Sequence, residues 1–229
     1  MNAEPLLQNA SLYLGGLATT LGLLAAALLL GGSLAVPLAV CRSRHGSLAS
    51  RAVWLFTYLV RGTPLLVQLY LLYYGAAQFE WVRTSVAWTA LKSAWFCAML
   101  AMAVNTCAYT TEMLAGAIRS LPPGEIEAAA AVGMSSWQRL RRVVLPLALR
   151  RSIPAYSNEA VMMLHGTSLA SVVTLVDITG AARDVNARYY LPFESFLAAA
   201  SLYLVLTFVL VGLFRRAERR WLAPLRRAT

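Results

Sequence analysis

The sequence predicts an all-α integral membrane protein, with five transmembrane helices in a single transmembrane domain that covers residues 1–229. Two observations predict this class. Only 13% of the 229 residues are charged, whereas a soluble domain usually carries about a quarter. Residues 12–40 and 195–214 contain no charged side chain, and about 20 apolar residues are enough to span the hydrocarbon of a bilayer.

We place the five spans where the apolar runs lie between polar connections. Their approximate bounds are 12–40, 64–82, 88–118, 153–176 and 193–214. The residues before the first run include Glu4 and no Lys or Arg, unlike the basic start of a secretory signal peptide. We therefore expect the first span to be kept as an anchor.

The second span follows a break at Arg61-Gly-Thr-Pro64. Thr63 can cap a helix that starts at Pro64, because proline suits the first helical position and threonine accepts from free N–H groups. The apolar stretch from Ala52 would then be an interfacial helix that precedes the span. Arg61 and Pro64 would lie at the membrane boundary, either as part of a gate or with Arg61 simply reaching toward the lipid head groups.

The placement of charge predicts the orientation of the chain. Segments 41–51, 119–151 and 215–229 hold 15 Arg and 3 acidic residues, whereas the N-terminus with segments 80–84 and 177–194 holds 3 Arg and 5 acidic residues. Basic segments stay in the cytoplasm, so the N-terminus is expected outside and the C-terminus inside. The net charge of +10 then reflects topology and contact with anionic membrane lipid, and no nucleic acid is expected as a partner.

Residues 119–151 form a polar insert between the third and fourth spans, and it contains two predicted short helices. Glu125 and Glu127 suit the positive end of a helix dipole, and the alanines Ala128–Ala131 favour a helix strongly. Gly133 can adopt the left-handed conformation that ends such a helix. The alanines leave a smooth face on which another surface could lie closely; the alternative is a solvated loop.

The second short helix of the insert is predicted to begin at Ser135. Ser135-Ser-Trp-Gln138 matches a capping box, and arginines follow it. We expect this helix to stop at Leu145-Pro146, because proline is poorly tolerated inside a helix.

Two carboxylates, Glu112 and Glu159, lie inside predicted spans and away from their ends, where each costs at least ~2.5–3.5 kcal/mol without a partner or water. Glu112 could form a structural ion pair or line a path. Glu159 follows Asn158 and precedes Thr167, and this group could receive a cationic side chain; the alternative is a bond to a nearby arginine or to a neighbouring subunit. We take Glu112, Asn158, Glu159 and Thr167 as a candidate substrate path.

The chain lacks recognisable motifs for its own chemistry. Lys92 is the only lysine and does not lie in the Gly-Lys-Ser/Thr sequence of a P-loop. His45 and His165 lack the spacing of metal ligands, and the three cysteines lie in or beside apolar runs. We expect no catalytic residue, cofactor or metal, so energy from ATP must arrive through another chain.

The spacing of Glu127-Ala128-Ala129, Gly133 and Leu145-Pro146 resembles the EAA signature of the binding-protein-dependent ABC importer permeases. In that family the insert is a coupling helix that docks in a groove of the ATPase subunit. The resemblance implies an ATPase-docking segment formed by Glu125, Glu127, Ala128, Ala129, Gly133, Leu145 and Pro146.

Further segments resemble the polar amino acid permeases within this class. RGTPLLVQLY, which starts at Arg61, is one such segment. AYTTEMLAGAIRSLP and RRSIPAYSNEAVMMLHGTSLA are similar to the M-type subunits of the histidine/lysine/arginine/ornithine branch. Ala115 and His165 stand where arginine and lysine are frequent in the wider family, and both match this branch.

The resemblance implies a multi-pass subunit of an importer for basic amino acids in the bacterial inner membrane. Its partners would be a homologous permease subunit in a heterodimer, an ABC ATPase dimer and a periplasmic amino acid-binding protein. An importer of opines or other polar amino acids is the alternative within the class. An ion-coupled secondary transporter that uses Glu112 and Glu159 is the alternative outside it, although such carriers are usually built from repeats that this sequence does not show.

Overall fold

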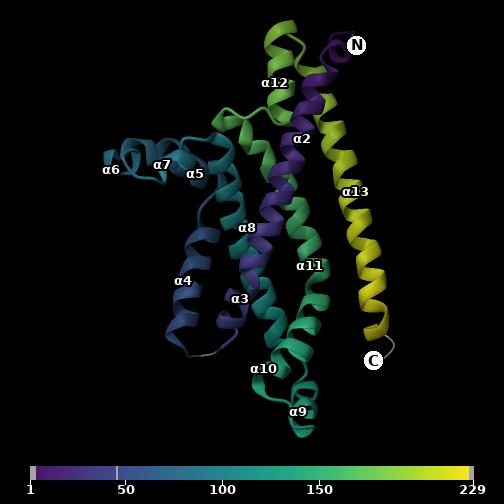
Figure 1. The fold of residues 1–229 in the computed structure, drawn as a ribbon. Helices are drawn as coiled ribbons and strands as arrows, with labels where there is room; N and C mark the ends of the chain where they lie inside the picture. Colours follow the sequence, from purple (N-terminus) through teal and green to yellow (C-terminus); the bar gives the residue numbers. More distant parts are fainter. Residues whose placement is uncertain (1–3, 45, 227–229) are drawn as a thin grey trace.

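The computed structural model describes residues 4–44 and 46–226, and its regular elements are helices, as predicted (Figure 1). The long rods α2–α3, α8, α11 and α13 run alongside one another, and α9 and α10 lie at one end of them. In chain order the elements are α1 (Glu4–Gln8), α2 (Ala10–Ala26), the π-helix η1 (Ala27–Gly31), α3 (Gly32–Arg42), α4 (Leu48–Gly62), α5 (Leu65–Tyr70), the π-helix η2 (Leu71–Gly75), the 3₁₀ helix η3 (Ala76–Gln78), α6 (Glu80–Arg83), α7 (Trp88–Leu91), α8 (Ala94–Arg119), α9 (Pro123–Ala131), α10 (Ser136–Arg139), the π-helix η4 (Leu140–Val144), α11 (Leu145–Gly166), the 3₁₀ helix η5 (Thr167–Val173), α12 (Ile178–Tyr189) and α13 (Pro192–Arg226).

The first rod, Ala10–Arg42, is one continuous helix of 33 residues that contains the predicted span 12–40. Two of its glycines lie against the backbone of other helices. A Cβ atom on Gly16 would lie 2.6 Å from the carbonyl oxygen of Asp177, and one on Gly31 would lie 2.6 Å from that of Ala103. Small residues allow helices to approach this closely inside a membrane.

The chain breaks at the predicted position after the first rod, but the two sides of the break differ from the prediction. Helix α4 ends at Gly62, α5 begins at Leu65, and their axes differ by 99°. Figure 1 shows α4 alongside α8, whereas α5 turns away from it. The stretch from Ala52, expected as an interfacial helix, therefore packs along the long rods, and α5 also contacts α8 and buries Leu69 in the core.

Thr63 does not cap α5, contrary to expectation. Its hydroxyl donates back to the carbonyl oxygen of Leu59 at 3.0 Å, and Pro64, at the N-cap position, makes no side-chain cap. Gln68 instead satisfies the end of α4, because its amide donates to the carbonyl oxygen of Val60 at 2.7 Å and to that of Thr63 at 3.1 Å. A side chain of α5 therefore satisfies the carbonyl groups at the C-terminal end of α4.

The predicted spans 64–82 and 88–118 are divided differently in the structure. Residues 65–91 form the short elements α5 to α7 rather than one long helix. The long helix α8 begins only at Ala94, where the hydroxyl of Ser93 accepts from the backbone N–H of Phe96 at 3.4 Å. Ser93 therefore acts as an N-cap, and the long helix within the predicted span 88–118 begins at Ala94.

The end of the polar insert also differs from the prediction. The capping box is present, since Ser135 and Gln138 each accept from the other's backbone N–H. However, Leu145-Pro146 does not stop the helix, because α10 continues through η4 into α11. Pro146 falls in the first turn of α11 directly after the π-helix, whose wider turn accommodates the missing N–H of proline.

Helix α12 occupies the predicted polar connection 177–194. It packs against α2 and α13, and its buried face contains Ile178, Ala181, Ala182 and Val185, all 0% exposed. A second core surrounds Leu23, Met102 and Leu164 where α2, α8 and α11 meet.

By length and composition, two described helices are apolar enough to cross a membrane, Ala10–Arg42 and Pro192–Trp221. The number rises to four if each bent pair, Leu48–Gly62 with Leu65–Gln78 and Ser136–Val173 with Ile178–Tyr189, forms one span. Helix α8 is long enough, at 26 residues, but carries many buried small and polar side chains.

Candidate functional site

Helix α9 of the polar insert lies beyond the end of the long rods (Figure 1). Glu127 and Ala128 are exposed on it, whereas Ala129 is buried, at 7% exposure. Ala129 therefore packs inward, and its outward neighbours are open to another protein. Glu125 lies 3.9 Å from Arg151 of α11, in a pair whose side chains are 40% and 32% exposed and which is therefore weak.

Gly133 ends α9 in a Schellman motif. Its φ of +80° is left-handed, as the sequence predicts. The backbone N–H of Met134 donates to the carbonyl oxygen of Ala129 at 3.2 Å, and that of Gly133 donates to Ala130 at 3.0 Å. The turn that follows the exposed alanine face is thus defined by backbone hydrogen bonds that require a left-handed residue.

Leu145 and Pro146 lie apart from this exposed face. Both are partly buried in the first turn of α11. The residues of the EAA signature therefore lie in two places, on and after the exposed helix α9 and in the first turn of α11. Their part in docking stays a prediction.

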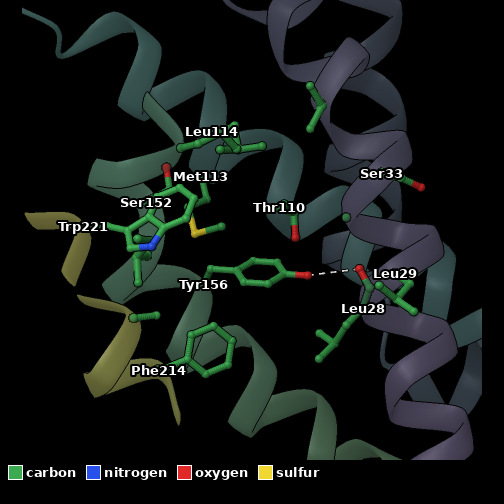
Figure 2. Close-up of a pocket in the computed structure, with 15 residues that line it drawn as sticks. Leu28, Leu29, Ser33, Thr110, Met113, Leu114, Ser152, Tyr156, Phe214 and Trp221 are labelled. Atoms are coloured by element: carbon green, nitrogen blue, oxygen red, sulfur yellow. Dashed lines mark hydrogen bonds between the residues drawn. The ribbon is translucent and has the colours of Figure 1, made fainter. Parts of the chain in front are cut away.

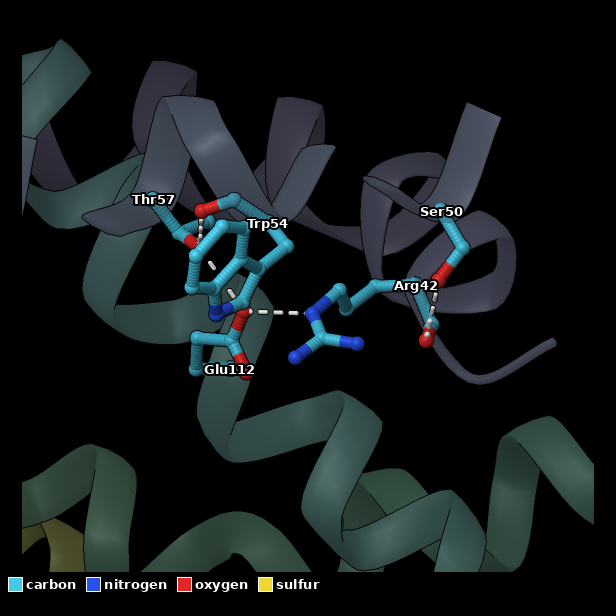
Figure 3. Close-up of polar contacts among 5 residues, drawn as sticks. All are labelled: Arg42, Ser50, Trp54, Thr57 and Glu112. Carbon is cyan, nitrogen blue, oxygen red and sulfur yellow. Dashed lines mark hydrogen bonds and ion pairs between the residues drawn. The ribbon is translucent and has the colours of Figure 1, made fainter. Parts of the chain in front are cut away.

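Glu112 is engaged within the protein (Figure 3). Its Oε1 accepts from Nε of Arg42 at 2.8 Å and from the hydroxyl of Thr57 at 2.7 Å. The two donors come from α3 and α4, so Glu112 on α8 connects three helices. The Arg42 and Glu112 side chains are 20% and 16% exposed. The geometry is that of the structural ion pair, one of the two alternatives that the sequence leaves open.

A cavity of about 360 Å³ lies between α4, α8 and α11 and brings together several of the predicted residues. The guanidinium of Arg61 lies 5.1 Å from the ring centroid of Tyr109, in a cation–π contact. Within the described residues, Glu159 makes no ion pair within 4 Å. The cavity is lined by Arg61, Tyr109, Glu112, Met113, Ala155, Asn158 and Glu159.

The structure does not bring Thr167 or Pro64 into this cavity. Thr167 is fully buried at the start of η5, and its hydroxyl donates to the carbonyl oxygen of Leu164 at 2.6 Å. Pro64 lies at the exposed break between α4 and α5. Of the residues predicted for the path and the boundary, the cavity thus contains Glu112, Asn158, Glu159 and Arg61.

Asp177 is a buried polar residue that the sequence analysis missed. It is 0% exposed and caps α12, accepting from the backbone N–H of Gly180 at 2.9 Å and of Thr179 at 3.2 Å. The hydroxyl of Tyr203 on α13 donates to it at 2.9 Å. An aspartate ahead of a helix is a recognisable capping signal, but its partner on α13 has no local signal.

Curated relatives share about half of the residues of this chain. The histidine/lysine/arginine/ornithine transport system permease protein HisM of Salmonella typhimurium is 51% identical over 208 residues, which cover 90% of this chain and 88% of that protein. HisM of Escherichia coli K12 is 49% identical and covers 96% and 92%. The nopaline transport system permease protein NocM of Agrobacterium fabrum is 42% identical and covers 100% and 95%.

A solved structure described as an amino acid ABC transporter with histidines matches 96% of this chain and 99% of its own, with a TM-score of 0.84 and 29% identity. Residues 18–223 match the family described as binding-protein-dependent transport system inner membrane component.

The fold, the insert and these similarities define a membrane transport component. The chain belongs to the binding-protein-dependent transport system inner membrane component family. It is thus a permease subunit of an ABC importer and not an enzyme, and the ATPase is a separate subunit in these systems. The resemblance on which the sequence analysis relied is confirmed.

Proposed function

We propose that this chain is the membrane-spanning permease subunit of an ATP-driven importer for basic amino acids, which a periplasmic binding protein delivers. Support comes from the HisM relatives, whose names give histidine, lysine, arginine and ornithine. The proposed substrate class depends on the position of Glu159. A carboxylate in a spanning helix normally pairs or lines a path, and Glu159 borders a cavity without an ion-pair partner among the described residues.

The cavity suits part of a cationic amino acid. The carboxylate of Glu159 would attract the substrate's ammonium or guanidinium group, and the amide of Asn158 would hydrogen-bond to it. The ring of Tyr109 forms a cation–π contact with the guanidinium of Arg61. The same ring would form such a contact with the cationic group of the substrate once Arg61 has moved away. Arg61, on the opposite wall at the break after α4, could leave its place over the ring as the path opens.

The exposed helix α9 would dock in the ATPase subunit. Glu127 and Ala128 would lie in the contact, with Ala128 permitting close approach and Glu127 pairing with a basic residue. Glu125, Ala129 and Gly133 would keep this helix in shape, while Leu145 and Pro146 would connect it to the membrane part. ATP-driven closure of the ATPase dimer would then move the rods and expose the cavity to alternate sides.

We also propose five spans in one transmembrane domain, with the N-terminus outside and the C-terminus in the cytoplasm of a bacterium. Figure 1 shows α1 and the last turns of α13 at opposite ends of the long rods, as an odd number of crossings requires. The C-terminal ends of α3 and α8 and the polar insert lie at the same end of the rods as the C-terminal end of α13. The segments at this end are the arginine-rich ones. The positive-inside rule assigns that end to the cytoplasm.

The complete importer would contain a second, homologous permease subunit, so that the membrane part is a heterodimer. The M-type resemblance supports this partner. NocM shows that a similar chain can serve a transport system named for an opine, and an opine is therefore the alternative substrate. An ion-coupled carrier is not favoured, because the chain belongs to a binding-protein-dependent family and Glu112 is occupied by Arg42 and Thr57.

The test is uptake of labelled arginine, lysine and histidine into proteoliposomes that contain the assembled importer, binding protein and internal ATP. Glu159→Gln should lower uptake of these cationic substrates at least roughly tenfold, the effect of about 1.4 kcal/mol, while ATP hydrolysis continues. Glu194→Gln, in the first turn of α13 and outside the cavity, is the matched control. Unchanged uptake in the Glu159 variant would remove this residue from the path, and uptake without ATP would refute the importer.

A further inference from the structure

A second cavity, of about 550 Å³, lies between α3, α8, α11 and α13 (Figure 2). Its volume is within the range of about 300–1,000 Å³ that is usual for ligand sites. Figure 2 shows Leu28 and Leu29 on one side, Met113 on α8, and Phe214 and Trp221 on α13. Side chains of this kind make the wall apolar along its length.

The hydroxyls of this wall bond within the protein except that of Thr110, which is buried without a hydrogen-bond partner among the described residues. The hydroxyl of Tyr156 donates to the carbonyl oxygen of Leu28 at 3.0 Å, and that of Ser152 donates to Ala148 at 2.8 Å. The ring of Tyr156 meets Phe214 edge to face, with centroids 6.0 Å apart. Both hydroxyls therefore offer little to a polar ligand, and the cavity presents mainly carbon.

The α13 wall of this cavity continues into a basic segment. Trp221 lines the cavity and is still 54% exposed, as expected for a tryptophan at a membrane interface. The arginines beside the lining residues are exposed on the same turns: Arg215, Arg216, Arg219 and Arg220. The apolar part of α13 is open, since only 6% of the most apolar 18-residue window of Pro192–Trp221 is buried.

We propose that this cavity binds an acyl chain of an anionic phospholipid, whose phosphate is held by the arginines of α13. An apolar cavity in a membrane-embedded wall is filled most readily by hydrocarbon, and charge complementarity selects the lipid. Clusters of four or more Arg or Lys directly after a spanning helix typically recognise anionic head groups. This inference goes beyond the transport function and needs only that the chain lies in a membrane, as its family does.

The experiment uses the full chain, purified in detergent with its partner subunits. It is titrated with phosphatidylglycerol or phosphatidylcholine of identical acyl chains, and bound lipid is counted by native mass spectrometry. Phosphatidylglycerol should bind roughly tenfold or more tightly than phosphatidylcholine. Glycerol 3-phosphate, which has the phosphate without the chains, should not bind; if it binds as well as the lipid, the acyl-chain site is refuted.

Two variants separate the contribution of the cavity to lipid binding from the contribution of the arginines. Ala217→Trp fills the cavity from α13, where Ala217 is a lining residue, and should abolish the tight phosphatidylglycerol site; Leu213→Trp, on an exposed residue that does not line it, should not. Arg219→Gln with Arg220→Gln should weaken the site by roughly tenfold or more, at about fivefold per arginine. The same double change at Arg83 and Arg188, exposed on α6 and α12, is the charge control.

Gel filtration and circular dichroism check that each variant is folded, and Ala217→Leu replaces Ala217→Trp if the larger side chain disrupts the protein. Equal binding of the two lipids, or full binding after the cavity is filled, would overturn the proposal. Loss of the partner permease from the Ala217 variant with lipid binding intact would also overturn it, since a partner's helix would then be the occupant.

Discussion

Gly31 is a position at which one added methyl group should clearly disturb the packing of the first rod against α8. In Gly31→Ala the new Cβ would lie 2.6 Å from the carbonyl oxygen of Ala103, 2.9 Å from Cβ of Thr106 and 3.0 Å from the backbone nitrogen of Cys107. Ordinary contact begins near 3.4 Å, so the first rod and α8 must separate by about 0.8 Å. Overpacking of this kind typically costs about 1–3 kcal/mol.

Gly22→Ala is the matched control on the same rod, because an added Cβ there has no heavy atom within 4 Å. Alanine stabilises a helix relative to glycine by about 0.5–1 kcal/mol, so this variant should be neutral or slightly more stable. Thermal unfolding of both purified variants in one detergent measures the difference. Gly31→Ala should lower Tm by roughly 2–12 °C. An unchanged Tm for Gly31→Ala, or an equal fall in the control, would refute the close helix contact.

Three further predictions concern polar and backbone features. Gly133→Val should cost about 1–2 kcal/mol because valine must adopt a left-handed φ, and copurification with the ATPase should fall. Glu112→Gln should lower the free energy of unfolding by about 1–3 kcal/mol because it breaks a largely buried pair with Arg42. Asp177→Ala should cost about 0.5–2 kcal/mol through the lost cap of α12; thermal unfolding measures both.

Each of these has a matched comparison. Gly124→Val introduces the same side chain on α9 where nothing lies within 4 Å, and it should keep the ATPase; loss in both would contradict the role of the turn. A double-mutant cycle with Arg42→Gln should return a coupling of about 0.5–3 kcal/mol, and additive effects would show that the pair is not coupled. Asp177→Asn keeps one side-chain oxygen as an acceptor but loses the other, so it should lose only part of the stability that alanine loses, whereas a loss as large as that of alanine would contradict the contribution of the remaining cap.

The helical class and the polar insert could be predicted because their signals are local. Uncharged runs require helices in lipid, and Gly133 and Ser135 mark the ends of short helices by their own backbone preferences. The break near Pro64 was located for the same reason. The hydrogen bonds that hold this break could not be predicted. They come from Gln68, whose amide donates to carbonyl groups before α5, and a glutamine one turn into a helix carries no sequence signal for this role.

The partners of the buried carboxylates could not be predicted from local pattern. Arg42 lies 70 residues from Glu112, and Tyr203 lies 26 residues from Asp177, so each pair depends on how helices are placed in space. Pro146 was misread for a different reason. Proline normally ends a helix, but a π-helix directly before it keeps the rod continuous.

That continuity has a mechanical consequence. From Ser136 to Val173 the chain forms one continuous helical segment. Its N-terminal end lies beside the exposed turn at Gly133, and the same segment carries the carboxylate of Glu159. Because this segment is continuous, we expect a displacement of its N-terminal end to move Glu159 as well, with any bending located at the π-helix η4 and at Pro154. The opposite wall of the cavity includes Arg61 in the last turn of α4, directly before the 99° break, so a tilt of α11 relative to α4 would change the width of the cavity.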